Sequence, residues 1–346
     1  MTRRLGTVLV ARLDNDGDVL LAGPVIRAAA AHARRVVLLA GPRGQQAAAL
    51  LPGVAEVLCW PCPWIDPDPP PVDPTDVEWL VKEIAARPVE RALVLTSYHQ
   101  SPLPLALVLR LAGVPWVGAI SDDYPGSLLD LRHRPPETGL HEVERMLSLA
   151  TAAGLPLPPG DDGRLAVRRP LPDTRALTGA DPYVVVHPGA SVPARVPTPG
   201  RMAEFTAALV DDGCRVVVTG AAGEASLTAE VAAPGGVDLG GRLTFTELGD
   251  VLDRAAAVVV GNTGPAHLAA AVGTPVVSLF APVVPAERWR PWRVPTVLLG
   301  DQEAPCAASR ARACPVPGHP CLDTVAAADV VAAVETLAPH GRPPRR

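Results

Sequence analysis

The chain has 346 residues, a formal net charge of −5, and contents of 48% hydrophobic, 19% charged and 3% aromatic residues. This length favours two domains, and the balance of apolar and charged residues excludes an intrinsically disordered chain. The negative charge and the few aromatic residues argue against nucleic acid as a partner.

The sequence has neither an apolar run long enough to cross a membrane nor the start of a secretory signal peptide, so we expect a cytoplasmic protein. Lys82 is the only lysine, and a clamp for phosphate groups therefore has to be built from arginine. Three of the six cysteines, Cys306, Cys314 and Cys321, share a segment rich in proline and glycine. Their spacing fits no familiar zinc pattern, and both metal binding and pairing stay open.

The first half of the chain alternates short apolar runs with helix-forming segments. Buried strands are predicted at residues 7–11, 36–39, 54–60, 91–96 and 117–120, and helices at 19–33, 45–51, 77–86, 103–112 and 141–153. Seven prolines among residues 61–74 predict a loop with little regular structure. The alternation itself predicts an α/β fold with a parallel, doubly wound sheet.

Polar loops follow these strands. Arg12, Asp14, Asp16 and Asp18 come directly after the first strand, and His99 lies in the loop after residues 91–96. Ligands of open α/β sheets bind at the carboxyl ends of the strands, so these loops are candidates for a site. By position alone, a solvated loop with a helix-capping aspartate is an equally good interpretation.

A stretch rich in proline, glycine and charge, residues 154–173, predicts a domain boundary. After it the alternation restarts, with strands predicted at 183–186, 215–219, 237–239, 258–260 and 275–280, and helices at 206–211, 225–233, 245–255, 267–272 and 325–337. We therefore expect a first Rossmann-like domain at 1–165, a linker at 166–180, a second Rossmann-like domain at 181–324, and a closing helix and tail at 325–346.

The most informative local pattern is VVVGNTGPAHLAAAVGTP at residues 258–275. A β-branched strand stops at Gly261, and a helix follows that Asn262 or Thr263 can cap. Gly264 lets a ligand approach the backbone, and the positive end of the helix dipole makes an anion site. His267 can reach the same place. We interpret this loop as the seat of a diphosphate, although many α/β turns use glycine, asparagine and threonine in the same way.

Longer stretches of the chain resemble a known family. GNTGPAHLAAAVGTPVVSLF at 261–280 looks like the C-terminal signature of the heptosyltransferase-like glycosyltransferases, glycosyltransferase family 9. RLDNDGDVLLAGPVIRA at 12–28 resembles the N-terminal signature of the same family. The resemblance implies the GT-B architecture, in which two Rossmann-like domains, one for the acceptor and one for the donor, face each other across a cleft.

The resemblance also implies roles for individual residues. Asp18 matches the general base, while Arg195, Glu224, Asn262, Thr263, Gly264 and His267 match groups that bind the nucleotide-sugar donor. Arg12, Asp14 and His99 are assigned to the acceptor side. Two departures stand out: Asn262 replaces the commoner aspartate, and the usual Trp-Pro after Arg195 is absent.

The function implied is an inverting, metal-independent glycosyltransferase that moves heptose or a related sugar from a nucleotide diphosphate, with an ADP-sugar favoured, to an acceptor hydroxyl. It needs no cofactor beyond this co-substrate. The acceptor is a glycan, a lipid-linked molecule or a small molecule, with peripheral contact at the inner face of the membrane as a further expectation. The alternatives are a catalytically weak nucleotide-sugar-binding partner protein and a nucleotide-sugar epimerase.

Overall fold

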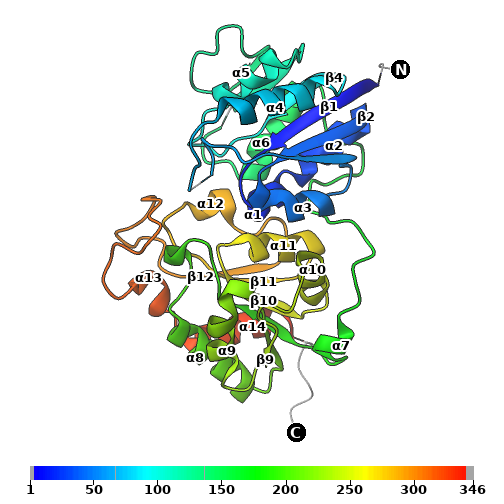
Figure 1. Cartoon of the computed structure of the whole chain (residues 1–346). Coiled ribbons are helices and arrows are strands. Elements are labelled where there is room, and N and C mark those ends of the chain that lie inside the picture. The colour runs from blue at the N-terminus through cyan, green and yellow to red at the C-terminus, as the bar shows by residue number, and fades with distance from the viewer. Residues whose placement is uncertain (1–3, 67, 136, 340–346) are drawn as a thin grey trace. The chain divides into compact units, whose positions relative to one another are not determined.

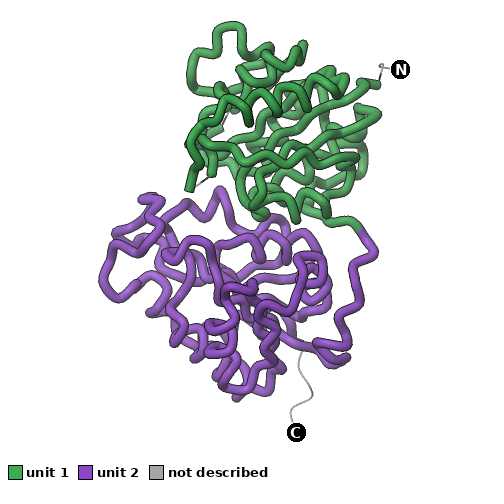
Figure 2. The backbone as a smooth tube through the Cα atoms, viewed as in Figure 1, with its two compact units in different colours: residues 1–168 green, residues 169–346 purple. Residues whose placement is uncertain are grey.

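Each half of the chain forms its own parallel sheet. The computed structural model describes residues 4–66, 68–135 and 137–339, which fall into two compact units that divide between Arg168 and Arg169 (Figures 1 and 2). Both sheets have six strands, and every neighbouring pair of strands is parallel. The predicted α/β class is confirmed.

The first unit has the strand order β3-β2-β1-β4-β5-β6. Its strands are β1 (Leu5–Arg12), β2 (Ala33–Ala40), β3 (Glu56–Cys59), β4 (Val89–Val94), β5 (Val117–Ile120) and β6 (Leu131–His133). Its helices are α1 (Asp16–Leu21), α2 (Gly23–His32), η1 (Pro42–Gly44), α3 (Gln45–Leu50), α4 (Pro74–Ala85), α5 (Leu103–Leu111) and α6 (Glu142–Ala152).

Residues 19–33 are predicted to be helical, with the helix proper beginning around Gly23 because of Pro24, and the structure has two helices there. Helix α1 begins earlier than predicted, at Asp16, and α2 starts at Gly23 with Pro24 in its first turn. Proline has no N–H with which to continue the hydrogen-bond ladder of the preceding helix, so the chain restarts the helix there.

The second unit has the order β12-β11-β10-β7-β8-β9. Its strands are β7 (Val184–His187), β8 (Val216–Val218), β9 (Val237–Asp238), β10 (Ala257–Gly261), β11 (Val276–Leu279) and β12 (Thr296–Leu299). Its helices are α7 (Arg175–Thr178), η2 (Pro193–Arg195), α8 (Pro199–Asp211), η3 (Ala222–Glu224), α9 (Ala225–Ala232), α10 (Phe245–Asp253), α11 (Gly264–Val272), α12 (Ala286–Trp289), α13 (Pro320–Asp323) and α14 (Ala327–Leu337).

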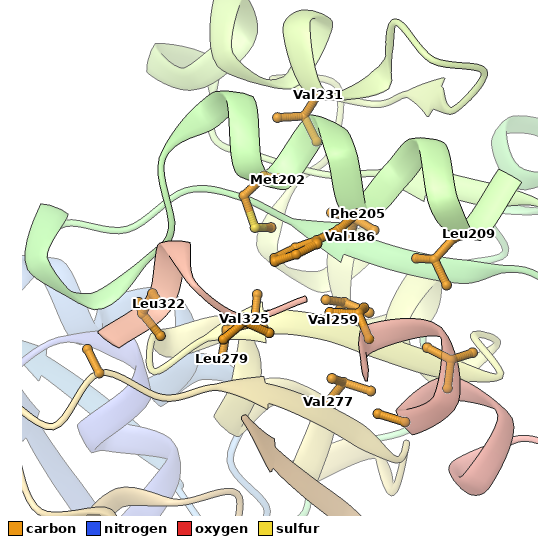
Figure 3. Packing of buried hydrophobic residues seen from close by; sticks show 14 of the residues in the cluster. Val186, Met202, Phe205, Leu209, Val231, Val259, Val277, Leu279, Leu322 and Val325 are labelled. Carbon is orange, nitrogen blue, oxygen red and sulfur yellow. The ribbon is translucent and has the colours of Figure 1, made fainter. Parts of the chain in front are cut away.

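The core of the second unit lies between its sheet and the helices on one face. Met202 and Phe205 of α8 pack with Val186, Val259 and Val277 of the central strands, and all five side chains are fully buried (Figure 3). The Val-rich strands are buried on both faces, which is why they read as continuous apolar runs in the sequence.

The strand orders decide where each unit can bind a ligand. The order in which successive strands are added to the sheet reverses between the neighbours β1 and β4 in the first sheet, and between β7 and β10 in the second. Loops that leave the carboxyl ends of such a pair diverge and open a crevice. The polar loops singled out in the sequence, residues 12–18 and 261–264, both leave from these strands.

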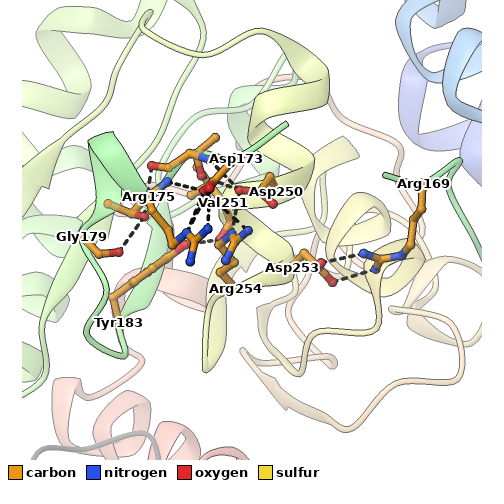
Figure 4. Close-up of polar contacts among 11 residues, drawn as sticks. Arg169, Asp173, Arg175, Gly179, Tyr183, Asp250, Val251, Asp253 and Arg254 are labelled. Carbon is orange, nitrogen blue, oxygen red and sulfur yellow. Dashed lines mark hydrogen bonds and ion pairs between the residues drawn. The ribbon is translucent and has the colours of Figure 1, made fainter. Parts of the chain in front are cut away.

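The first residues of the second unit are held to helix α10 by a small polar network (Figure 4). Asp250 of α10 accepts hydrogen bonds from Thr174 N at 2.9 Å and Thr174 Oγ1 at 2.7 Å, and from Arg254 Nε at 2.8 Å. Arg169 makes a bidentate ion pair with Asp253, with both N–O distances 2.7 Å. The first network is buried and the second is partly exposed.

Across the described parts of the chain, every helix is too short or too polar to cross a bilayer.

These two contacts of α10 allow a matched test of stability. Asp250→Ala leaves the buried Thr174 groups without their acceptor and removes one of the two carboxylates that pair with Arg254, and we expect it to lower the free energy of unfolding by about 2–4 kcal/mol. Asp253→Ala breaks only the partly exposed pair and should cost less than about 1 kcal/mol. Urea denaturation of both variants checks this, and equal losses would contradict it.

Candidate functional site

A buried arginine organises the carboxyl end of β1. Arg12, the last residue of the strand, has no solvent exposure. Its Nε lies 2.9 Å from Asp14 Oδ2, and its Nη2 donates to Asp18 Oδ1 and to Ser97 Oγ, both at 2.8 Å. The structure therefore brings Arg12, Asp14 and Asp18 together, as the sequence pattern suggested for one loop.

Helix α6 contributes two further charged side chains near the guanidinium of Arg12, Glu142 and Arg145. Glu142 is fully buried, with Oε2 3.9 Å from Arg12 Nη1 and 3.5 Å from Arg145 Nη1. Arg145 also donates to the carbonyl of Thr96 at 2.6 Å, at the end of β4. Burial by itself lowers the pKa of Arg12, but Asp14, Asp18 and Glu142 outweigh this effect and raise it, so Arg12 is cationic.

Sequence analysis did not assign roles to Ser97, Glu142 or Arg145. Glu142 and Arg145 belong to the segment HEVER, where His141 caps α6 and Glu144 completes the capping box. A signal was present, because Glu and Arg three residues apart lie on one face of a helix. Their partner on β1 is more than a hundred residues away, and no local pattern identifies it.

Asp18 is the most accessible member of this cluster. Its side chain is 23% exposed, while Arg12 is 0% and Asp14 11% exposed. Only Oδ1 of Asp18 is taken up by Arg12, and Oδ2 accepts no hydrogen bond from residues 4–66, 68–135 and 137–339. One carboxylate oxygen thus stays available on a side chain that the other oxygen holds in place.

The two neighbouring aspartates have local partners of their own. Asp14 accepts a hydrogen bond from Gln100 Nε2 at 2.6 Å, and burial raises the pKa of Asp14. Asp16 accepts from the backbone N–H of Ala47 at 2.9 Å, in the first turn of α3, and burial raises its pKa to about 6. Asp16 therefore caps a helix.

His99 lies in the loop that follows β4. Its ring is exposed and packs edge-on against Tyr98, with a centroid separation of 5.4 Å. Gln100, the next residue, donates a hydrogen bond to Asp14.

The second sheet presents the Asn262 loop at the carboxyl end of β10. Thr263 occupies the N-cap position of α11 in an extended conformation, and Pro265 lies in the first turn, as predicted. The side chain of Thr263 makes no cap hydrogen bond to α11 within the described residues. Asn262 Oδ1 instead accepts from Ala281 N at 3.4 Å.

Two polar atoms of this loop are buried and unpaired. Asn262 Nδ2 and Thr263 Oγ1 have no hydrogen-bond partner among the described residues. An unpaired buried polar group costs free energy, and such groups usually meet a ligand or an ordered water. Here both atoms lie next to the first turn of a helix, where backbone N–H groups also lack intrahelical partners.

Two loops from neighbouring strands pack directly beside Gly261 and Gly189. A Cβ atom at Gly261 would lie 2.4 Å from the carbonyl oxygen of Arg195, and one at Gly189 would lie 2.1 Å from Glu224 Oε1. At Gly261 the neighbour is backbone, so only glycine permits an approach this close, whereas at Gly189 it is the end of a flexible side chain. Arg195 and Glu224, both half-buried, are thereby held at the same edge of the sheet as Asn262.

Two buried histidines flank this edge. His187, the last residue of β7, contacts Thr219 Oγ1 through Nδ1 at 2.9 Å, and burial lowers its pKa to about 4. His267 lies in the first half of α11 and is 7% exposed. The structure therefore places all six predicted donor residues within the second unit, around β7, β8 and β10.

The cysteines are free thiols. Cys306 and Cys321 are buried, Cys314 is partly buried, and burial with the two neighbouring thiols raises the pKa of Cys321 to about 12. Within the described ranges, no group of three or more His, Cys, Asp or Glu side chains is arranged to hold a metal ion.

Comparisons with known proteins confirm the family resemblance. A family model described as glycosyltransferase family 9 (heptosyltransferase) matches residues 80–319. Lipopolysaccharide heptosyltransferase 3 of Escherichia coli is 32% identical over 225 residues, which are 60% of this chain and 63% of that protein. The match thus spans less than two thirds of this relative's length. The segment with Asp18 lies outside the residues that the family model matches.

Solved structures share the fold. A family 9 glycosyl transferase from Veillonella parvula has a TM-score of 0.77 at 16% identity, with 98% of both chains covered. The E. coli ADP-heptose LPS heptosyltransferase II has a TM-score of 0.72 at 20% identity, covering 96% of this chain and 98% of that chain.

The raised pKa of Asp16 predicts that the stability of the folded protein depends on pH. Its pKa is about 6 in the folded protein and lower in the unfolded chain, so between these values the folded state binds more protons. Stability therefore falls as pH rises from about 4 to about 6. Asp16→Asn keeps an acceptor for Ala47 N and should gain about 2 kcal/mol over wild type at pH 7 but nothing at pH 4. Thermal denaturation across this range checks the difference, and an equal effect at both pH values would contradict it.

Proposed function

The chain belongs to glycosyltransferase family 9, and from this premise we propose that it transfers heptose or a related sugar from a nucleotide diphosphate to an acceptor hydroxyl. We propose an inverting reaction that needs no metal or other cofactor. The observation that carries the proposal is the pair of buried, unpaired atoms at Asn262 and Thr263, beside the N-terminus of α11.

A bound diphosphate provides hydrogen-bond acceptors for the two unpaired polar atoms of this loop. The amide of Asn262 and the hydroxyl of Thr263 are hydrogen-bond donors, and phosphate oxygens are strong acceptors. Arg195, packed by its backbone onto Gly261, supplies a positive charge, and the dipole of α11 adds to it. His267 contributes a further donor from the same helix.

The nucleoside is assigned to the neighbouring loop. Glu224 lies against Gly189 and accepts a hydrogen bond from Ala221 N at 2.8 Å through Oε2. Its other oxygen is proposed to accept from a ribose hydroxyl. The relation to a heptosyltransferase whose name specifies ADP-heptose favours an ADP-sugar as donor.

Asp18 is proposed as the general base. Its oxygen takes the proton of the acceptor hydroxyl while that oxygen attacks the anomeric carbon, and the bond from this carbon to the diphosphate oxygen breaks. Attack from the face opposite the leaving group inverts the anomeric centre. Negative charge grows on the diphosphate, where Arg195 and the α11 N-terminus stabilise it more strongly in the transition state than in the ground state.

The acceptor is assigned to the first unit, with Arg12, Asp14 and His99 as predicted contacts. A glycan, a lipid-linked molecule and a small molecule all remain consistent with this assignment. The cytoplasmic location and the contact with the inner face of the membrane stay predictions.

A binding protein that no longer catalyses is the second candidate. It is favoured by the engagement of Asp18 Oδ1 with Arg12 Nη2 at 2.8 Å, which leaves only one carboxylate oxygen for an acceptor hydroxyl. Asn262 in place of the commoner aspartate points the same way. The epimerase alternative has no comparable support from the site.

Replacement of the base separates the two candidates. Asp18→Asn keeps a side chain of the same size, and we expect release of ADP from the sugar donor to fall by about 10²–10⁴-fold with donor affinity unchanged. Asp16→Asn, two residues away, is the matched control and should retain activity. Equal turnover by wild type and Asp18→Asn would support the binding protein.

Donor identity is tested by thermal stabilisation. At a concentration 100-fold above Kd a bound ligand stabilises the protein by about 2.7 kcal/mol. We expect ADP-sugars to raise the melting temperature more than UDP-, GDP- or dTDP-sugars.

The isosteric variant Thr263→Val tests the proposed loop in the same assay. It removes the unpaired hydroxyl and should reduce the stabilisation by an ADP-sugar, whereas Thr336→Val, on the exposed face of α14, should not. Equal stabilisation of Thr263→Val and wild type would exclude this loop from the donor site.

A further inference from the structure

A buried hydrogen bond between two side chains joins the carboxyl ends of β7 and β8. His187 is the last residue of β7, and Thr219 directly follows β8. The imidazole Nδ1 lies 2.9 Å from Thr219 Oγ1, and the two residues are 6% and 0% exposed. The strands pair in parallel up to Val186 and Val218, and the backbone N–H of Thr219 donates to the carbonyl of Val186 at 3.0 Å. His187 and Thr219 are therefore the next pair in the same register.

The loops that continue from this pair meet at the carboxylate of Glu224. A Cβ atom at Gly189, two residues after His187, would lie 2.1 Å from Glu224 Oε1. A Cβ atom at Gly220, directly after Thr219, would lie 3.2 Å from Glu224 Oε2. One carboxylate thus touches both loops, close to the point where the hydrogen bond joins the two strands.

The imidazole is a neutral spacer between the two strand ends. Burial lowers the pKa of His187 to about 4, so the ring is uncharged near neutral pH and needs no counterion. A buried ring nitrogen without a partner costs free energy, so the contact with the Thr219 hydroxyl fixes the orientation of the ring. Valine has the shape of threonine but offers no polar atom, which makes the contact easy to remove.

We propose that His187 and Thr219 are positioning residues of the donor site, and that their hydrogen bond places the Glu224 carboxylate for a ribose hydroxyl. The bond fixes the spacing between the two loops that touch this carboxylate. Its loss lets the loops shift, while the loop after β10, proposed to hold the diphosphate, keeps its place. Neither side chain contacts the nucleotide in this assignment. The inference rests on the proposed function, because it concerns how the nucleoside part of that site is held.

Two nucleotides that differ only in the ribose hydroxyls test the proposal on the full-length protein. The probes are ADP and 2′,3′-dideoxy-ADP, and isothermal titration calorimetry gives their affinities. Wild type should bind ADP about tenfold more tightly, because the analogue leaves Glu224 without its partner. Thr219→Val should weaken ADP about tenfold and the analogue less than about twofold, so that the preference disappears. An equal loss for both nucleotides, or an unchanged preference, would overturn the proposal.

Three further variants separate this role from a general loss of packing. Thr219→Ser keeps the hydroxyl and should bind both nucleotides as wild type does. Thr274→Val removes a different buried hydrogen bond, from Thr274 Oγ1 to the carbonyl of Leu252 at 2.7 Å, and should also leave both affinities unchanged. His187→Phe keeps a planar ring without Nδ1 and should reproduce the loss seen in Thr219→Val. It decides the test if Thr219→Val does not fold, and a retained preference in His187→Phe would contradict the proposal.

A double variant shows whether Thr219 acts through Glu224. In Glu224→Ala the ribose contact is already lost, so the addition of Thr219→Val should weaken ADP by less than about twofold more. A further tenfold loss would mean that Thr219 affects another part of the site, and the assignment would then be wrong.

Kinetics with the sugar donor give a second readout. Thr219→Val should raise KM for the donor about tenfold and leave kcat unchanged, because the proposed base and the loop after β10 are intact. A reduced kcat with an unchanged KM would contradict a role in holding the ribose.

The failure of this inference differs from the failure of the proposed function. A wild type that prefers ADP to the dideoxy analogue, with a Thr219→Val variant that keeps this preference, contradicts only the positioning role. A wild type that binds no ADP contradicts the proposed donor, and the inference with it. Selective ADP binding that depends on Thr219, in a protein whose turnover is unaffected by Asp18→Asn, supports the positioning role and contradicts the transferase.

Discussion

The buried guanidinium of Arg12 is the constraint on which the first unit depends. A charge without solvent contact is costly unless carboxylates and hydrogen-bond acceptors surround it. Asp14 and Asp18 come from the loop after β1, and Glu142 comes from α6 on another part of the chain. The need to neutralise one cation therefore fixes the start of α1, the position of α6 and the exposed oxygen of Asp18 at one end of the sheet.

The second unit meets a different structural requirement at the carboxyl ends of β7, β8 and β10. It has to bring several loops close together without filling the space that a ligand would occupy. Gly261 does this by allowing the backbone of Arg195 to approach within a distance that a Cβ atom would forbid, and the side chain of Glu224 packs against Gly189. The loop at Asn262 then keeps two buried polar atoms unpaired, a cost that binding of a diphosphate would remove.

The two units differ in the charged and polar groups near their candidate binding loops. Positive groups, a helix N-terminus and unpaired donors gather in the second unit, where an anionic donor is expected. In the first unit Arg12 and Arg43 are both engaged by aspartates.

Sequence by itself determined the α/β class, most of the strands and the loop at residues 261–264, because these depend on apolar periodicity and on the chemistry of adjacent residues. It could not supply the short edge strands β6 and β12, whose three or four residues carry little pattern, or the separate helix α1 that precedes Gly23. Only the tertiary structure placed Glu142 beside Arg12 and Gln100 beside Asp14. Both pairs join segments far apart in the chain, and their contacts arise from the packing of the sheet rather than from any local preference.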